Sequence, residues 1–190
     1  MMNKLLLLFF LTFIFGNYIA QEDIKWLSWQ EMMKERTEDS VKKKVFIDLY
    51  TGWCGWCKRM DATTFKNPSI SQYMNQKYYP VKFDAETRDT IVFNNHQFIN
   101  SDPSYIKKAV NSRGKVNWFA NSILDGKLSY PSYVILDEDL VRLMIYKGFK
   151  QEDELLGILL FFGSDQYKNY HNFLNSQWAN SLQKNNSKSP

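Results

Sequence analysis

Val45-Phe46-Ile47-Asp48-Leu49-Tyr50 is followed, two residues later, by Trp53-Cys54-Gly55-Trp56-Cys57-Lys58. The first stretch is rich in β-branched and aromatic residues, which is typical of a buried strand. Thr51 and Gly52 interrupt this pattern, and the residues from Lys58 onward favour a helix. We therefore predict that Cys54 lies where a strand gives way to a helix, with Cys57 in the first helical turn.

This position is suited to thiol chemistry. Unpaired N–H groups and the positive end of the dipole at a helix N-terminus favour a thiolate. An exposed Cys54 thiolate, with Cys57 close enough for a disulfide, is the arrangement that dithiol–disulfide exchange requires. A zinc site is one alternative, but zinc normally takes four ligands, and His96 and His171 have no ligand spacing to the cysteines. A purely structural disulfide is another, although so short a loop constrains little chain entropy.

The motif resembles the active site of the thioredoxin superfamily. Members carry a buried acid on the strand, Trp before the first Cys, a small residue after it and a basic residue after the second. Asp48, Trp53, Gly55 and Lys58 stand at these places. The resemblance extends over about residues 24–162, without the segment 87–127, and implies an α/β thioredoxin fold, in which a central mixed sheet is flanked by helices.

A second part of the resemblance lies farther along the chain. Ser129-Tyr130-Pro131-Ser132 precedes an apolar stretch that starts at Tyr133, like the family's cis-proline and the strand after it. Pro131 would then be cis, and the backbone at Tyr130 would bind a client in the manner of an added strand. A trans proline that merely starts an edge strand is the alternative.

The resemblance also implies the catalytic roles. Cys54 would attack a client disulfide to form a mixed disulfide, and Cys57 would then attack that bond and release the reduced client. Asp48 would help to move the proton of Cys57, and burial in an apolar strand should raise its pKa. Thioredoxins pair this acid with a lysine on the next strand. Lys82 lies near that place, but Pro80 is an alternative occupant, which would leave the acid without its lysine.

The residues between and beside the cysteines bear on clients and on the direction of electron flow. Trp53 and Trp56 would flank the sulfurs as a client platform, although Trp53 could instead serve packing. The pair Gly55-Trp56 contains no His and so supplies no extra cation to stabilise the thiolate. This favours a protein-disulfide reductase. A disulfide oxidase or isomerase is the alternative among enzymes, and a peptide-binding or chaperone-like module is the alternative from another class.

The expected partners follow from this chemistry. No organic cofactor and no metal is implied, because electrons would arrive by exchange with another dithiol protein. The partners would be disulfide-bonded protein clients and a dithiol electron donor, for which a membrane-embedded protein is one candidate. The formal net charge of +4, with no long basic stripe, does not indicate nucleic-acid binding.

Residues 1–20 have the features of a secretory signal peptide. Lys4 precedes the apolar run from Leu5 to Phe15, and Ala20 precedes Gln21. An uncleaved membrane anchor is the alternative, although the run is shorter than the ~20 residues that a spanning helix usually needs. Both cysteines lie in one motif, which fits an exported, periplasmic redox protein.

The remaining residues, 21–185, are predicted to form one domain and a monomer, with a disordered tail at 186–190. Residues 87–127 would be a helical insertion before the proline, with helices near 104–112 and 118–124. It would pack over one edge of the fold or shape a client groove next to Trp56. Residues 164–185 would be a C-terminal helical extension. Its apolar stripe predicts packing, with a partner surface as the alternative, and consists of Tyr167, Tyr170, Leu174, Trp178 and Leu182.

Local signals predict further element boundaries. Ser28 and Glu31 form a capping box for a first helix, after an edge strand at 24–27. Ser69 would cap a helix that leads to a strand at 78–84. The last predicted elements are a hairpin of strands at 132–136 and 140–146 and a helix at 151–162.

Overall fold

The computed structural model describes residues 22–99 and 116–186, with side chains described as far as Trp178. In chain order, its elements are α2 (Trp29–Glu38), β1 (Lys44–Tyr50), α3 (Gly55–Ala62), the short 3-10 turn η1 (Thr64–Lys66), α4 (Pro68–Lys77), β2 (Tyr78–Asp84), β3 (Ile91–Phe93), β4 (His96–Phe98), α6 (Trp118–Ile123), β5 (Ser132–Leu136), β6 (Arg142–Lys147), α7 (Glu152–Gly163) and α8 (Gln166–Asn186).

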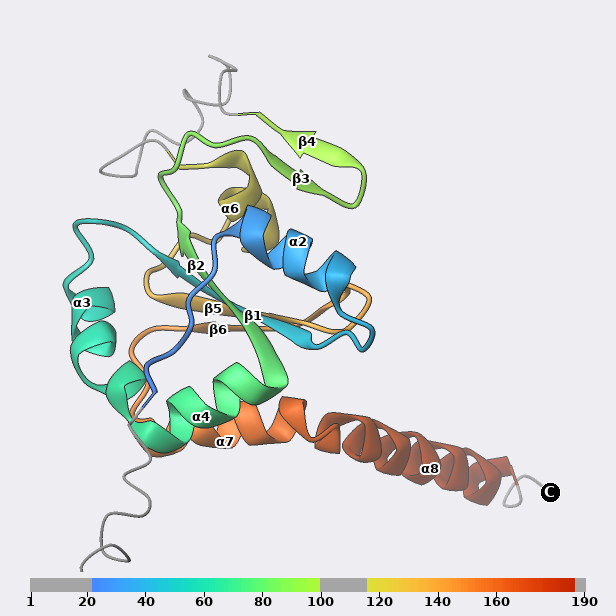
Figure 1. The fold of residues 1–190 in the computed structure, drawn as a ribbon. Helices are drawn as coiled ribbons and strands as arrows, with labels where there is room; N and C mark the ends of the chain where they lie inside the picture. The colour runs from blue at the N-terminus through green and yellow to red at the C-terminus, as the bar shows by residue number, and fades with distance from the viewer. Residues whose placement is uncertain (1–21, 100–115, 187–190) are drawn as a thin grey trace, which may run out of the picture.

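The central sheet has the strand order β2-β1-β5-β6 (Figure 1). Strand β1 pairs in parallel with β2 and antiparallel with β5, and β6 pairs antiparallel with β5. Six of the seven residues of β1 are buried, as expected for a strand with a neighbour on each side and helices on both faces. This mixed sheet, with the cysteine motif directly after its central parallel strand, is the thioredoxin fold, and it confirms the predicted fold class.

Alternation along β1 divides the core into two clusters, one on each face of the sheet. Val45, Ile47 and Leu49 belong to the cluster that includes Trp29 of α2 and Phe119 of α6. Phe46 points to the opposite face, into the cluster formed with α3, α4 and α7. Asp48 is two residues from Phe46 and therefore shares its face, which is the face on which α3 carries the cysteines.

The described part of the insertion contributes to the core. Phe119 of α6 lies 4.7 Å from the ring of Trp29 and 5.3 Å from that of Phe83, measured between ring centroids. Helix α6 confirms the helix predicted near 118–124. The hairpin of β3 and β4 was not predicted, because two three-residue strands are too short to show a period. The helix predicted at 104–112 lies outside the described residues.

Several boundaries differ from those predicted. Asn67, not Ser69, caps α4, because its side chain accepts from the backbone N–H groups of Ser69 and Ile70, with Pro68 at the first helical position. Strand β6 begins at Arg142 rather than at 140, because Leu140 adopts a positive φ of 63° in the turn. Residues 24–27 do not form a regular strand, although Leu27 makes a single parallel bridge to Val81. The capping box of α2 is present as predicted.

Helix α7 packs closely against α4 and the start of β2. The Tyr78 hydroxyl donates to the carbonyl of Leu159 at 2.7 Å. At Gly163, a Cβ atom would lie 2.9 Å from the Tyr73 ring and 3.1 Å from the Tyr78 hydroxyl, so a side chain here would require one of these groups to move.

The packing predicted for the stripe of α8 is wrong for most of its described residues. Tyr167 lies against Phe162, with ring centroids 5.3 Å apart. Tyr170, Leu174 and Trp178 are exposed. Asp165, with φ of 61°, separates α8 from α7, and α8 then extends away from the sheet (Figure 1). The side chain of Leu182 lies outside the described part of the chain.

Candidate active site

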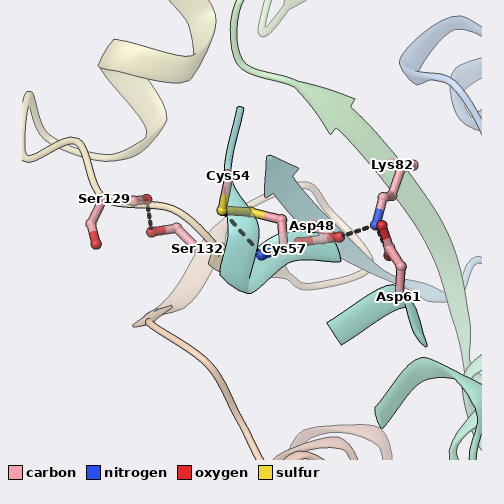
Figure 2. Close-up of a disulfide and its surroundings, with 7 residues drawn as sticks. All are labelled: Asp48, Cys54, Cys57, Asp61, Lys82, Ser129 and Ser132. Carbon is pink, nitrogen blue, oxygen red and sulfur yellow. Dashed lines mark hydrogen bonds and ion pairs between the residues drawn. A yellow bond between two sulfur atoms is a disulfide. The ribbon is translucent and has the colours of Figure 1, made fainter. Parts of the chain in front are cut away.

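Cys54 and Cys57 lie where the sequence predicts, at the junction of strand and helix. Cys54 is the N-cap of α3, and its Sγ accepts a hydrogen bond from the backbone N–H of Cys57 at 3.1 Å. The two residues form a disulfide, with their Cα atoms 5.3 Å apart (Figure 2). Only 4% of Cys54 is exposed, so the expectation of an exposed sulfur is wrong for the disulfide form. The cap draws its side chain back over the first turn of the helix.

Asp48 is buried beside this disulfide on the same face of the sheet, and only 1% of its side chain is exposed. Lys82 on β2 donates from Nζ to Oδ2 of Asp48 at 2.6 Å, and the two residues are register partners in the parallel pair. The alternative assignment of Pro80 is wrong, because Pro80 stands opposite Phe46. Burial raises the pKa of Asp48 to about 6 against the opposing effect of the Lys82 charge, which confirms the predicted direction.

Lys82 is held between two carboxylates. Its Nζ also forms an ion pair with Asp61 of α3, which is 45% exposed, whereas Lys82 itself is 19% exposed (Figure 2). Burial alone would lower the pKa of Lys82, but Asp48 and Asp61 together raise it. The sequence analysis did not identify Asp61. Its position four residues after Cys57, hence on the same side of the helix, is the signal that could have indicated it.

Polar groups without protein partners lie near this acid. Oδ1 of Asp48 and the hydroxyl of Tyr133 are buried and accept or donate no hydrogen bond within the described part of the protein. Tyr133 is the register partner of Asp48 on β5. Burial, with Asp48 and Asp61 nearby, raises the pKa of Tyr133, so its hydroxyl stays protonated and can act as a donor.

The loop before β5 lies next to the disulfide. The Tyr130–Pro131 peptide bond is cis. The Ser132 hydroxyl donates to the carbonyl of Ser129 at 2.6 Å, which closes the turn around the proline (Figure 2). The backbone N–H of Gly148 donates to the carbonyl of Pro131 at 2.8 Å, so the loop after β6 is fixed against the same turn.

The two tryptophans flank the disulfide with different neighbours. Trp53 is 44% exposed, its ring lies edge-on to Tyr130 at 6.0 Å, and its Nε1 donates to Glu86 at 2.9 Å. Trp56 is 54% exposed and packs against Phe149, with ring centroids 5.6 Å apart. Both therefore retain exposed apolar surface, which permits the platform role predicted for them.

Arg59 and Phe149 extend the surface beside Trp56, and the sequence analysis did not identify either. The Arg59 guanidinium lies 5.3 Å from the Trp56 ring centroid and 5.1 Å from that of Phe149. The surroundings of Trp56 are thus built by α3 and the loop after β6. The sequence could have indicated Phe149 as a site residue only if the contact of its loop with Pro131 had been known.

Among the described residues, no group of three or more His, Cys, Asp or Glu side chains could hold a metal ion. In the same part of the chain, no helix is long and apolar enough to cross a membrane. The predicted signal peptide at 1–20 lies outside the described residues.

The fold and the Cys54–Cys57 pair define a thioredoxin-like protein with the active-site disulfide of a thiol–disulfide oxidoreductase. The family model Thioredox_DsbH, described as a protein of unknown function, DUF255, matches residues 14–125. This is more than half of the chain, and the chain belongs to this family.

Individual relatives match over shorter stretches. An uncharacterized protein of Archaeoglobus fulgidus is 36% identical over 67 residues, which are 35% of this chain and 51% of that protein. Spermatogenesis-associated protein 20 of Rattus norvegicus is 26% identical over 73 residues, 38% of this chain and 9% of that protein. This chain thus spans about half of the first relative and a small part of the second. A solved structure of a DsbH oxidoreductase is similar over 70% of this chain and 82% of its own, with 17% identity and a TM-score of 0.45.

Proposed function

We propose that this protein reduces protein disulfides in the cell envelope by dithiol exchange through Cys54 and Cys57. The observation that carries the proposal is the Cys54–Cys57 disulfide at the start of α3, beside a buried Asp48 whose pKa is raised to about 6. A carboxyl group with this pKa can accept a proton near neutral pH and release it again, which a resolving thiol requires.

The reaction balances with the groups at hand. The Cys54 thiolate attacks one sulfur of a client disulfide, forms a mixed disulfide and releases the first client thiolate. The hydrogen bond from the Cys57 N–H to Cys54 Sγ favours the attacking thiolate. The Cys57 thiol then gives its proton to Asp48, directly or through water, and attacks Cys54 Sγ. The second client thiolate leaves, and two electrons have passed to the client.

Regeneration requires a dithiol donor, because the product state is the Cys54–Cys57 disulfide. We propose an envelope location because an apolar run follows Lys4 in the sequence. Trp53, Trp56, Tyr130 and cis-Pro131 would contact the client, since they surround the sulfurs.

The direction is tested by equilibrating the mature protein in glutathione or dithiothreitol buffers and measuring its reduction potential. A value near the ~−270 mV of thioredoxin would support the reductase, and a value near ~−120 mV would make the protein an oxidant. A pair that forms no disulfide would exclude redox function. The Cys57→Ser variant should trap clients as mixed disulfides on Cys54, whereas Cys54→Ser should trap none. Cell fractionation tests the location.

A further inference from the structure

One side of the active site carries a group of positive charges, which we call the basic rim: Arg59, Lys147 and Lys150. Lys147 ends β6 and is the register partner of Ser132, the residue after Pro131. Its Nζ donates to the backbone carbonyl of Lys127 at 2.9 Å. Lys150 Nζ donates to the carbonyl of Lys147 at 3.1 Å. Lys147 and Lys150 are therefore linked along the loop whose Gly148 donates to Pro131.

The basic rim is also attached to the helix of the cysteines. The backbone N–H of Lys150 donates to Sδ of Met60 at 3.4 Å, and its carbonyl accepts from the hydroxyl of Thr64 at 2.8 Å. Arg59, on α3, lies over the Phe149 ring of the same loop. The charges thus occupy the strip from Pro131 to Trp56, along which a client segment bound beside the disulfide would run.

The charged groups of the basic rim differ in their partners from other cations among the described residues. Across residues 22–99 and 116–178, no carboxylate lies within 4 Å of the charged groups of Arg59, Lys147 or Lys150. Other cations of the fold, such as Lys44 and Arg142, do have carboxylate partners. The two lysines of the rim use backbone carbonyls instead, which leaves their positive charge available to a partner.

Asp48 and Asp61 are paired with Lys82, and further carboxylates near the disulfide lie beyond Trp53 and beyond Phe149. Glu86 is bonded to Trp53, on the other side of the sulfurs. Glu152 and Asp153 begin α7, and with Arg59 and Phe149 they line a surface cavity of about 410 Å³ beyond the rim. Glu152 also accepts from the Asn67 side chain at 2.5 Å. A partner that lies along the strip beside Pro131 would therefore meet the positive charges of the basic rim.

We propose that the basic rim binds acidic residues that flank the reactive disulfide of the client, so that this protein prefers clients whose disulfide lies in an acidic segment. This inference rests on the proposed function and specifies its substrate class. Exposed ion pairs are individually weak, but several charges of one sign also speed association at low ionic strength. Because the Debye length falls from ~30 Å at 0.01 M to ~3 Å at 1 M salt, the preference should be strong only at low salt.

The test uses two peptides with the same disulfide, one flanked by Asp and Glu and the other by Ser and Gln. Their reduction by the mature reduced protein is measured as kcat/KM at about 10 mM and about 1 M salt. We expect the acidic peptide to be preferred by about tenfold at low salt and about equally at high salt. The double variant Lys147→Gln/Lys150→Gln should lose most of this preference. Lys34→Gln/Lys77→Gln removes the same charge from exposed lysines of α2 and α4 and should keep it.

Two results would overturn the inference: equal kcat/KM for the two peptides at low salt, or equal loss of preference in both double variants. Reduction of the neutral compound hydroxyethyl disulfide distinguishes failure of this inference from failure of the proposed function. If that disulfide is not reduced, the redox proposal fails. Binding of the two peptides to the oxidised protein then still decides the inference, because equal affinities at low salt would contradict it.

Discussion

Replacing Asp48 by Asn should stabilise the protein at neutral pH. Asp48 is ionised there, yet it is buried, and Lys82, with which it forms an ion pair, is shared with Asp61. The Asn side chain has nearly the same shape and carries no charge. Lys82 keeps its ion pair with Asp61 in the variant, so no buried cation is left without a partner.

The magnitude follows from the pKa of Asp48. A pKa raised from 3.8 to about 6 corresponds to about 3 kcal/mol, at about 1.36 kcal/mol for each pKa unit. Below pH ~4, Asp48 is protonated in the folded and the unfolded protein, so ionisation costs nothing. Between pH ~4 and ~6 the unfolded state ionises first, and stability falls as pH rises. Above pH ~6 the whole cost is present.

Urea denaturation of the oxidised proteins at pH values from 4 to 8 measures this cost. Asp48→Asn should be more stable than the wild type by about 3 kcal/mol at pH 7 to 8, and the difference should disappear towards pH ~4. The control is Asp139→Asn, which makes the same change in an exposed turn and should alter stability by less than about 0.5 kcal/mol. A variant no more stable than the wild type at pH 7, or a difference that does not depend on pH, would refute the reasoning.

Three further predictions concern the same site and the core. Lys82→Met should raise the pKa of Asp48 above about 6, because the attractive charge of Lys82 is lost. The pH midpoint of client reduction should then move upward, and an unchanged midpoint would contradict this. Asp61→Asn should lower that midpoint, because the Asp61 charge raises the pKa of Asp48; an upward move would contradict the assignment. Phe162→Ala should lower the free energy of unfolding, measured by urea denaturation, by about 3 to 5 kcal/mol, because the side chain is only 2% exposed. The control Phe173→Ala on α8, where the side chain is 57% exposed, should lower it by less than about 0.5 kcal/mol. Similar losses in the two variants would contradict the described packing.

The sequence predicted those parts of the fold that repeat over several residues or rest on local chemistry. The central strand, the cap at Cys54 and the strand from Tyr78 to Asp84 agree with the structure because burial and capping decide them locally. The sequence did not decide whether Lys82 or Pro80 stands opposite Asp48. Strand register depends on how two distant segments pair, and neither strand sequence alone specifies it.

Other features depend on where loops and helices lie in space. Arg59 and Phe149 meet only because the loop after β6 returns to α3, and nothing in either segment indicates that contact. For the apolar stripe of α8, the sequence predicted a packing contact that most of its described residues do not make. Helical spacing of apolar residues predicts which side of a helix is apolar, but it does not say whether another surface covers that side. Here the turn at Asp165 directs α8 away from the sheet.

The close approach of Gly163 to Tyr73 and Tyr78 gives the end of α7 a role in the proposed client surface, because α7 starts directly after the loop of the basic rim. Any side chain at this position would have to displace the Tyr73 ring or move α7 away from α4 and β2. Helix α7 is continuous back to Glu152, directly after the loop that carries Phe149 and Lys150. A substitution at Gly163 would therefore leave both cysteines and Asp48 in place and still shift the loop beside Trp56. Such a variant would reduce small disulfides at the normal rate and would be slow only in the reduction of protein clients.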